Sequence, residues 1–426
     1  MKIHLRGGRV IDPASGFDQI ADVCIAAGRV VSVGQAPADF NAQRVIDVSG
    51  LVVAPGLVDL AARLREPGLE HKATLESEMR AATVGGVTAL ACPPDTDPPL
   101  DEPGLVEMLK FRARNLPGPR VYPVGALTLG LAGATITEMS ELTEAGCIAF
   151  SQADAAITDT QVLMRAMQYA ATFDYPVWLR PQDPHLARNG VAHEGALAGA
   201  LGLVGIPVVA ETLAIATILQ LMRVTGARVH LCRLSSAAGV ELVRAAKAEG
   251  LPLSCDVAAH HLHLTDAGLA RFDAQLHLMP PLRSEADRQA LRAGVLDGTI
   301  DAVCSDHAPL DDDTKEVPFA ESESGATGLE LLLPLTLAWA AELKVSLPAA
   351  LAAVTCRPSR VLGLTLGQLH DGAPADVCVF DPDAVWVVSR NALVSQGRNS
   401  PFLGQTMRGR VRYTIIDGHL DFEAKD

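Results

Sequence analysis

The sequence lacks paired cysteines and has no excess of basic residues. Its eight cysteines are scattered from Cys24 to Cys378 without a CxxC pair, which favours free thiols over a disulfide framework. Acidic residues outnumber basic ones by 50 to 35, and the formal net charge of -15 would repel the phosphate backbone of a nucleic acid. We therefore expect no nucleic acid partner.

A long uninterrupted apolar segment is also missing. The first ten residues alternate polar and apolar side chains, unlike the continuous apolar core of a signal peptide. The most apolar later segments, 197–210 and 329–343, are short or interrupted by glycine, proline and glutamate, so neither predicts a membrane span. We expect a cytoplasmic protein that has no membrane partner.

What the sequence does contain is a repeated pattern of strands and helices. Eight short apolar runs rich in β-branched residues lie near 57–61, 87–92, 120–124, 147–150, 176–180, 228–233, 253–257 and 302–305. Between them, apolar residues recur at spacings of three and four, as in Val162, Leu163, Met167 and Ala170, which is typical of amphipathic helices. The alternation predicts an α/β fold, a (β/α)8 TIM barrel over residues 56–364.

The two ends of the chain have a different pattern. Residues 1–55 and 365–426 consist of short strands separated by turns, such as 27–29 and 417–419. Neither end alone would form a stable core, so we predict that they combine into one small β-sandwich domain beside the barrel. Two independent flaps are the alternative. The length of 426 residues suits either arrangement.

Six sequence blocks carry a more specific signal. They are residues 64–72 (LREPGLEHK), 85–96 (GGVT followed by PDT), 189–195 (NGVAHEG), 280–283 (PPLR), 306–309 (DHAP) and 399–402 (NSPF). In sequence and in order they resemble the signatures of class I dihydroorotases, members of the amidohydrolase superfamily. The resemblance spans almost the whole chain. It implies a barrel whose strand ends bind zinc and act on the dihydroorotate ring.

The metal positions of that family are where this chain departs from it. The family motif DxHxHxR reads DLAARLR here, and three further ligand positions are also changed. The five substituted positions are Ala61, Arg63, Ala153, Arg180 and Arg233. Zinc needs nitrogen, oxygen or sulfur ligands, whereas alanine supplies no ligand and arginine keeps a permanent positive charge. We therefore predict that the zinc expected from the resemblance is absent.

Asp306 survives in the position of the family's catalytic acid and base. One carboxylate cannot hold zinc, so we interpret it as a remnant that accepts hydrogen bonds from one or more of the arginines. Such a salt-bridge network would fill the former cavity. Asp154 lies one position from a family ligand, and its use as a shifted metal ligand stays an alternative, although the shift re-aims the side chain.

The substrate side is changed less completely. Arg65 matches the arginine that grips the dihydroorotate carboxylate in the family, and His307 is also kept. Asp95 and Met279 stand where the family has asparagines, and Leu310 replaces a second histidine. Asp95 would repel the substrate carboxylate. We expect a pocket remnant rather than a dihydroorotate pocket.

The remaining histidines near the strand ends are interpreted as structural. His230 matches a histidine that lies within a strand, and we expect it to be a satisfied interior residue. His260, His261 and His263 follow the seventh strand, and we expect them in a hydrogen-bonded turn. On an extended backbone, the adjacent His260 and His261 would point in different directions.

Three hypotheses for function follow. Some bacterial dihydroorotase-like proteins without metal ligands form a scaffold for the catalytic chain of aspartate carbamoyltransferase, so the resemblance implies an inactive assembly subunit of pyrimidine biosynthesis. A metal-free cyclic-amide hydrolase would instead use Asp306 as base and the arginines to stabilise an oxyanion. In the third hypothesis, Arg63, Arg65, Arg180 and Arg233 bind an anion or nucleotide in a regulatory subunit. Homo-oligomerisation is left open.

Overall fold

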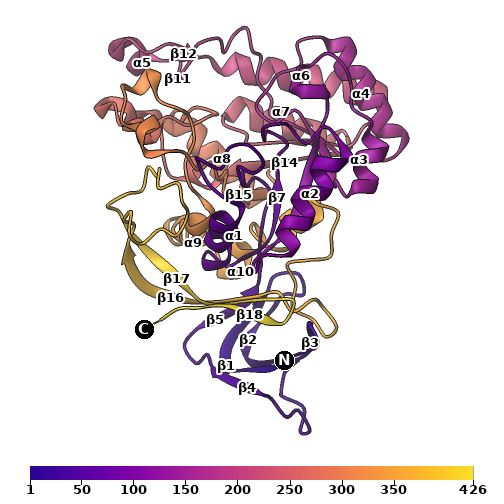
Figure 1. Ribbon diagram of the computed structural model, residues 1–426. Coiled ribbons are helices and arrows are strands. Elements are labelled where there is room, and N and C mark those ends of the chain that lie inside the picture. Colours follow the sequence, from indigo (N-terminus) through magenta and orange to yellow (C-terminus); the bar gives the residue numbers. More distant parts are fainter. Residues whose placement is uncertain (426) are drawn as a thin grey trace.

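The computed structural model describes residues 1–425, which form a β domain and an eight-stranded barrel (Figure 1). The β domain contains strands β1 (Lys2–Asp12), β2 (Phe17–Ala26), β3 (Arg29–Gly34), β4 (Arg44–Asp47), β5 (Val52–Pro55), β16 (Val377–Val387), β17 (Thr406–Ile416) and β18 (His419–Glu423). Their order is β18-β17-β16-β5-β1-β2-β3, with β4 paired to β1.

The two chain ends meet where β5 pairs with β16. This antiparallel pairing joins the amino-terminal and carboxy-terminal strands into one sheet, in which Val53 lies opposite Val379. Both side chains are buried in a separate apolar core, apart from that of the barrel. The prediction of a composite β domain is confirmed. The boundaries at residues 56 and 365 stay predictions.

The barrel strands are β6 (Leu57–Asp59), β7 (Val87–Cys92), β8 (Arg120–Ala126), β9 (Ala149–Ser151), β10 (Val177–Leu179), β13 (Val229–Leu231), β14 (Leu253–Ala258) and β15 (Ala302–Cys304). They pair in parallel from β6 to β15 in chain order. A parallel bridge between Ala62 and His307, directly after β6 and β15, joins the first strand to the last. The predicted TIM barrel is confirmed.

Helices surround the barrel strands (Figure 1). They are α1 (Leu75–Val84), α2 (Pro103–Arg114), α3 (Met139–Ala145), α4 (Thr160–Thr172), α5 (Ala196–Leu201), α6 (Val208–Thr225), α7 (Ala237–Ala248), α8 (Glu285–Asp297), α9 (Leu332–Leu343), α10 (Leu347–Ala352) and α11 (Cys356–Val361). Local sequence fixes where several of them begin. Thr74 with Ser77 forms a capping box at the start of α1, and Ser284 with Asp287 forms one at the start of α8.

Shorter elements lie in the connecting segments. They are the strands β11 (Ala192–His193) and β12 (Gly205–Ile206) and the 3-10 helices η1 (Leu129–Leu131), η2 (Ala259–Leu262), η3 (Asp266–Arg271), η4 (Ala274–Leu276), η5 (Asp312–Lys315), η6 (Phe319–Glu321) and η7 (Leu329–Leu331). Only η2 takes part in the site described below.

Among residues 1–425, α6 is the one helix with the length and hydropathy of a membrane span, with a mean hydropathy of 1.5. One such helix is weak evidence for a membrane, because core helices of soluble proteins pass the same test. Ile215, Leu219 and Met222 of α6 are buried in the main core, which also contains the barrel strands. We interpret α6 as part of the barrel wall. The cytoplasmic location stays a prediction.

Candidate functional site

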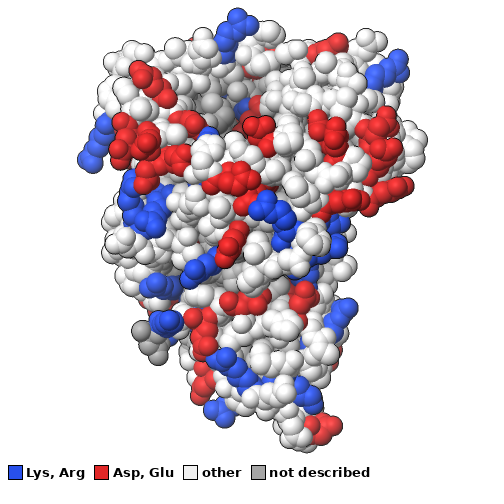
Figure 2. All heavy atoms as spheres, in the orientation of Figure 1, with Lys and Arg blue, Asp and Glu red and all other residues white. Residues whose placement is uncertain are grey.

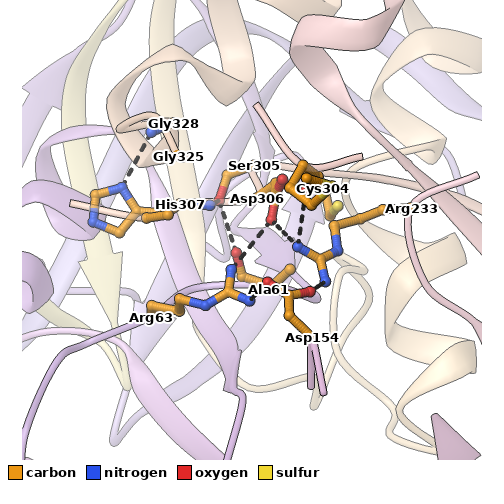
Figure 3. Close-up of polar contacts among 12 residues, drawn as sticks. Ala61, Arg63, Asp154, Arg233, Cys304, Ser305, Asp306, His307, Gly325 and Gly328 are labelled. Atoms are coloured by element: carbon orange, nitrogen blue, oxygen red, sulfur yellow. Dashed lines mark hydrogen bonds and ion pairs between the residues drawn. The ribbon is translucent and has the colours of Figure 1, made fainter. Parts of the chain in front are cut away.

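The predicted site residues converge because parallel strands all end at the same face of a barrel. Arg63 follows β6, Arg180 follows β10 and Arg233 follows β13. Asp154 and Asp306 come after β9 and β15. Their side chains meet at the barrel mouth in one network, which we call the arginine cluster (Figure 3).

Asp306 is bound by two of the arginines. Arg233 Nη1 donates to Asp306 Oδ1 at 2.8 Å, and Arg63 Nη1 donates to the same oxygen at 3.4 Å. All three side chains are buried. Figure 3 shows the two guanidinium groups approaching the carboxylates of Asp306 and Asp154 from opposite sides. The expected acceptance by Asp306 of arginine hydrogen bonds is therefore present in the structure.

Asp154 has a larger role than sequence reasoning gave it. Its carboxylate binds Arg63 Nη2 at 2.8 Å, Arg180 Nε at 2.8 Å and Arg233 Nη2. The sequence predicts Asp306 as the carboxylate that accepts hydrogen bonds from the arginines, and it suggests Asp154 only as a shifted metal ligand. Its position immediately after the substituted Ala153 was the one available signal. Asp154 is the only one of the two carboxylates that contacts Arg180.

The charges of the cluster stabilise one another. Burial alone would raise the pKa of Asp154, but Arg233, Arg63 and Arg180 outweigh it and hold that pKa well below its usual value. For Asp306, desolvation prevails and its pKa lies above the usual value, although Arg233 and Arg63 act in the opposite direction. Burial opposes the charge of Arg233 as well, yet Asp154 and Asp306 raise its pKa well above the ordinary value of an arginine.

Several site residues have an unusual backbone conformation. Positive φ angles occur at Arg65 (64°), Ala153 (49°), Arg233 (58°) and Asp306 (46°). This left-handed region is unfavourable for residues other than glycine, and such strain concentrates at functional sites. The loops after the strands therefore have a strained backbone at the mouth, and of these four residues Arg233 and Asp306 form ion pairs.

Little space remains beneath the cluster. A cavity of about 30 Å³ lies among Ala61, Arg63, Ala153 and Arg233, with Trp178 on its wall. That volume equals about one water molecule. The guanidinium groups thus occupy the end of the barrel where the alanines at positions 61 and 153 leave room.

The residues that match the substrate side have separate contacts. Arg65 is buried, and its Nε donates to the carbonyl of Pro309 at 3.0 Å. Burial lowers the pKa of Arg65, and the neighbouring Arg63 lowers it further. Asp95 accepts from Arg63 Nε at 2.7 Å. The Met279 side chain packs in a small apolar cluster with Ala187, Ile206 and Ala210.

His307 points away from the arginine cluster (Figure 3). Its Nε2 lies 2.6 Å from Glu78 Oε2, and its Nδ1 accepts from the Gly328 backbone N–H at 3.1 Å. The side chain is fully buried. The backbone of the Asp306–His307 turn aims these neighbours in opposite directions. The His307 ring therefore contacts Glu78 and Gly328 rather than the cluster, and its assignment to the pocket remnant stays a prediction.

The histidines after β14 lie in the 3-10 helix η2 rather than on an extended backbone. The expected turn is present, and in it the rings of His260 and His261 are adjacent, with centroids 4.7 Å apart, instead of diverging as they would on an extended backbone. His260 Nε2 has no hydrogen bond and lies 4.0 Å from Asp306 Oδ2. Burial lowers the pKa of each of these two histidines to about 3. His263 Nε2 donates to the Leu335 carbonyl at 2.9 Å.

A second group of metal-binding residue types lies deeper in the barrel. Ligand atoms of His230, Cys232 and Asp256 are within 4.8 Å of one another. His230 is satisfied, as expected, because Nδ1 binds Ser254 Oγ at 2.8 Å and Nε2 binds Asp256 Oδ2 at 2.9 Å. Burial raises the pKa of the Cys232 thiol well above 9, which disfavours the thiolate that a metal requires.

Comparisons with known proteins place the chain in a family. Residues 50–238 match the dihydro-orotase-like family model, and residues 204–420 match the amidohydrolase family model. A "Dihydroorotase-like protein" of Pseudomonas aeruginosa is 48% identical over 423 residues, covering 99% of this chain and 100% of that protein. This chain belongs to the dihydroorotase-like family of amidohydrolases. The resemblance found in the sequence is thereby confirmed.

Other relatives of this dihydroorotase-like chain carry two different names. A "Dihydroorotase-like protein" of Pseudomonas putida is 44% identical over 420 residues, 99% of both chains. A "Dihydroorotase" of Geobacter sp. (strain M21) is 39% identical over 424 residues, 100% of both chains. Among solved structures, the L-hydantoinase of Arthrobacter aurescens matches with a TM-score of 0.89 at 23% identity, covering 100% of this chain and 96% of that one. That likeness shows the fold.

The residues at the five family metal positions do not fit zinc. Ala61 and Ala153 have no ligand atom, and the arginines at the other three positions bring positive charge to the place of a cation. Their guanidinium N–H groups already donate to Asp95, Asp154 and Asp306. No catalytic step through zinc can be derived at these positions.

Proposed function

We propose that this dihydroorotase-like chain is a pseudoenzyme that holds no zinc at the barrel mouth and acts as an assembly subunit for the catalytic chain of aspartate carbamoyltransferase. The observation that carries the proposal is the arginine cluster. Arg63, Arg180 and Arg233 stand at family ligand positions and are paired with Asp154 and Asp306. These ion pairs occupy the positions where, by the resemblance, an active dihydroorotase would hold its metal and its catalytic carboxylate.

The chemistry of the cluster supports inactivity. Hydrolysis of a cyclic amide needs an activated water, which a zinc ion supplies by lowering the pKa of bound water to about 7. Arginine stabilises negative charge but activates no water. Asp306, the remaining candidate base, is held by Arg233 at 2.8 Å, so its electron pairs are directed at a permanent cation. A base in that arrangement is poorly placed to accept a substrate proton.

An assembly role explains why a chain without this chemistry keeps the fold. The barrel is complete and its core is packed, so the outer surface is held in a defined shape. The two Pseudomonas relatives are named "Dihydroorotase-like protein", whereas the Geobacter relative is named "Dihydroorotase". The assembly role itself comes from the sequence resemblance, which implies a scaffold for aspartate carbamoyltransferase where the metal ligands are missing.

One set of measurements on the purified protein tests both parts of the proposal. Elemental analysis should find less than about one tenth of a zinc ion per chain, and dihydroorotate turnover should equal the buffer background. Mixed with the catalytic chain of aspartate carbamoyltransferase from the same organism, the protein should co-elute with it in size-exclusion chromatography. Stoichiometric zinc with turnover would refute inactivity, and separate elution with unchanged transferase activity would refute assembly.

A regulatory anion site at the mouth is the second candidate, and Arg65 is the observation that favours it. The mouth carries four arginines, the three of the cluster and Arg65, against the carboxylates of Asp95, Asp154 and Asp306. Among residues 1–425, Arg65 pairs with no carboxylate. Calorimetry with carbamoyl phosphate and UMP tests this candidate. Binding that Arg65→Met abolishes would favour it over a purely structural cluster.

A further inference from the structure

A second, larger cavity lies at the opposite end of the barrel from the arginine cluster. It has a volume of about 400 Å³ and is lined by residues at the starts of β10, β13 and β14 together with part of α11. We call it the basal cavity. Its volume falls within the roughly 300–1,000 Å³ of sites that bind small molecules. Neither the family's chemistry nor the proposed function uses this end of the barrel.

Three arginines line the basal cavity. Arg360 of α11 is exposed, and its guanidinium group forms no hydrogen bond or ion pair with any residue from 1 to 425 that the structure describes. Arg228 is partly exposed, and its Nη2 donates to the Asp174 carbonyl at 2.8 Å. Arg357 donates only to the backbone carbonyls of Val295 and Ile300. Two of the three guanidinium groups therefore have no carboxylate partner.

The acidic groups nearby do not cancel this charge. Asp301 also lines the cavity, but its carboxylate binds Lys247 Nζ at 2.5 Å and the Cys255 backbone N–H at 2.8 Å. Asp174, the other acid in contact with the cavity arginines, lies 3.6 Å from Arg228 and is 84% exposed. The cavity wall is thus positive on a chain whose formal net charge is -15.

The wall of the cavity also contains an unsatisfied buried donor. Trp178 is 3% exposed, and its indole Nε1 has no hydrogen bond partner. Its ring contributes to this wall and to the small cavity below the arginine cluster. A buried N–H group without a partner costs about 1–3 kcal/mol. Ser254 adds a hydroxyl beside it, bound to His230 Nδ1 at 2.8 Å.

We propose that the basal cavity binds the phosphate group of a small phosphorylated metabolite. Guanidinium groups match phosphate oxygens with paired N–H donors, and arginine forks without carboxylate partners are free to do so. The volume beyond the phosphate accommodates an attached organic group, for which the Trp178 ring offers an apolar face. The inference is independent of the proposed assembly role, because it concerns residues that take no part in the arginine cluster.

Calorimetry and tryptophan fluorescence of the full-length protein test the site, with inorganic phosphate and UMP as probes. Both probes should bind, UMP more tightly, and raising the salt concentration should weaken both. Arg360→Glu should weaken UMP binding about 10-fold or more, because it removes a charge-assisted hydrogen bond and adds a repulsive charge. Arg408→Glu, at an exposed arginine of the β domain outside the cavity, makes the same charge change and should bind as the wild type does.

Variants that separate the site from general charge and folding effects complete the test. Trp178→Phe replaces the indole with a smaller aromatic ring that has no N–H group, and it should abolish the fluorescence response and weaken UMP binding several-fold, with circular dichroism confirming the fold. Equal affinity for phosphate and UMP would assign the site to free phosphate, and preference for UMP would assign it to a phosphorylated metabolite. Absence of heat with both probes, or wild-type affinity in Arg360→Glu, would overturn the proposal.

Discussion

Arg233 Nη1 donates to Asp306 Oδ1 at 2.8 Å, which joins two residues that the sequence resemblance aligns with a metal ligand and with the catalytic acid and base of dihydroorotases. The same guanidinium also binds Asp154. The Arg233 guanidinium thus links the carboxylates of Asp154 and Asp306 in one buried ion-pair network. Figure 2 shows a hollow in the surface of the barrel. Basic and acidic atoms lie together at the floor of this hollow, and many acidic side chains surround it.

Asp154 should be the most important carboxylate of the cluster for stability. Asp154→Asn leaves the shape of the side chain but removes the charge that binds Arg63, Arg180 and Arg233. Breaking a fully buried pair costs about 3–5 kcal/mol, and because the Asp154 side chain is 39% exposed we expect about 2 kcal/mol. Urea denaturation followed by circular dichroism measures the change in the free energy of unfolding.

Asp174→Asn is the matched control for that prediction. Asp174 is 84% exposed and pairs only with Arg228 at 3.6 Å, so its substitution should change the free energy of unfolding by less than about 0.5 kcal/mol. Equal effects of the two substitutions would mean that the arginine cluster is held together by packing rather than by the Asp154 charge.

A second buried pair, Glu78 and His307, should hold the carboxy-terminal segment against the barrel. The Glu78 carboxylate accepts from His307 Nε2 at 2.6 Å, from Ser395 Oγ at 2.6 Å and from the Gln396 backbone N–H at 3.0 Å. Glu78→Ala leaves these donors buried without an acceptor and should lower the free energy of unfolding by about 3–5 kcal/mol. Glu76→Ala, at an exposed position of the same helix, should have little effect.

The Glu78 prediction has a second, local measurement. Because Ser395 and Gln396 lose their acceptor, limited proteolysis should cleave the chain near residues 389–400 faster in Glu78→Ala than in the wild type. Glu78→Gln keeps one acceptor oxygen and should fall between the two. Unchanged proteolysis in Glu78→Ala would show that this segment is held by other contacts.

The sequence alone predicts the barrel architecture, and it predicts that the site residues lie together at one face of the barrel. Val87–Cys92 is almost entirely apolar, and Leu253–Ala258 alternates Leu253, Cys255 and Val257 with polar residues; both patterns are typical of strands. Once the strands are parallel, Arg63 and Arg233 have to meet at one face, because both directly follow a strand. Neither inference depends on a side-chain torsion angle.

Pairing within the site was beyond the sequence because it depends on local backbone angles. Arg233 and Asp306 have positive φ angles, which no sequence pattern predicts for these residue types. These angles decide where each side chain points. The position of Asp154 between three arginines and the inward turn of His307 toward Glu78 follow from such angles. The 3-10 turn at His260 is a further example.

Buried neutral histidines should make the protein sensitive to mild acid. Burial lowers the pKa to about 3 for His260 and His261 and to about 4 for His263 and His277, against an ordinary value of 6.5. Below pH 6.5 the unfolded chain binds protons that the folded chain does not, so the free energy of unfolding falls as the pH falls toward 4. Each histidine contributes up to about 1.4 kcal/mol per pH unit in that window.

His263→Gln isolates one of these contributions. The glutamine amide is able to donate to the Leu335 carbonyl, as His263 Nε2 does, but it takes up no proton on unfolding. Between pH 7.5 and 5.5 the variant should therefore lose about 1 kcal/mol less stability than the wild type. His370→Gln, at an exposed histidine, should follow the wild type. A parallel pH dependence in wild type and His263→Gln would contradict the prediction.

The eight cysteines should be unreactive in the folded protein. All eight are free, as the sequence predicted, seven are buried, and Cys232 is partly buried. Burial raises the pKa of each thiol above 9, to about 12 for Cys92, Cys147 and Cys378, so very little thiolate forms at pH 8.

Because the thiolate is the nucleophile, a disulfide reagent such as DTNB should modify fewer than one thiol per folded chain within minutes. After unfolding in guanidinium chloride it should modify all eight. Rapid modification of the folded protein would show that a thiol is accessible. If that thiol belongs to Cys232, the Cys232→Ser variant would lose the rapid modification. Modification of fewer than eight thiols in the unfolded chain would reveal a disulfide.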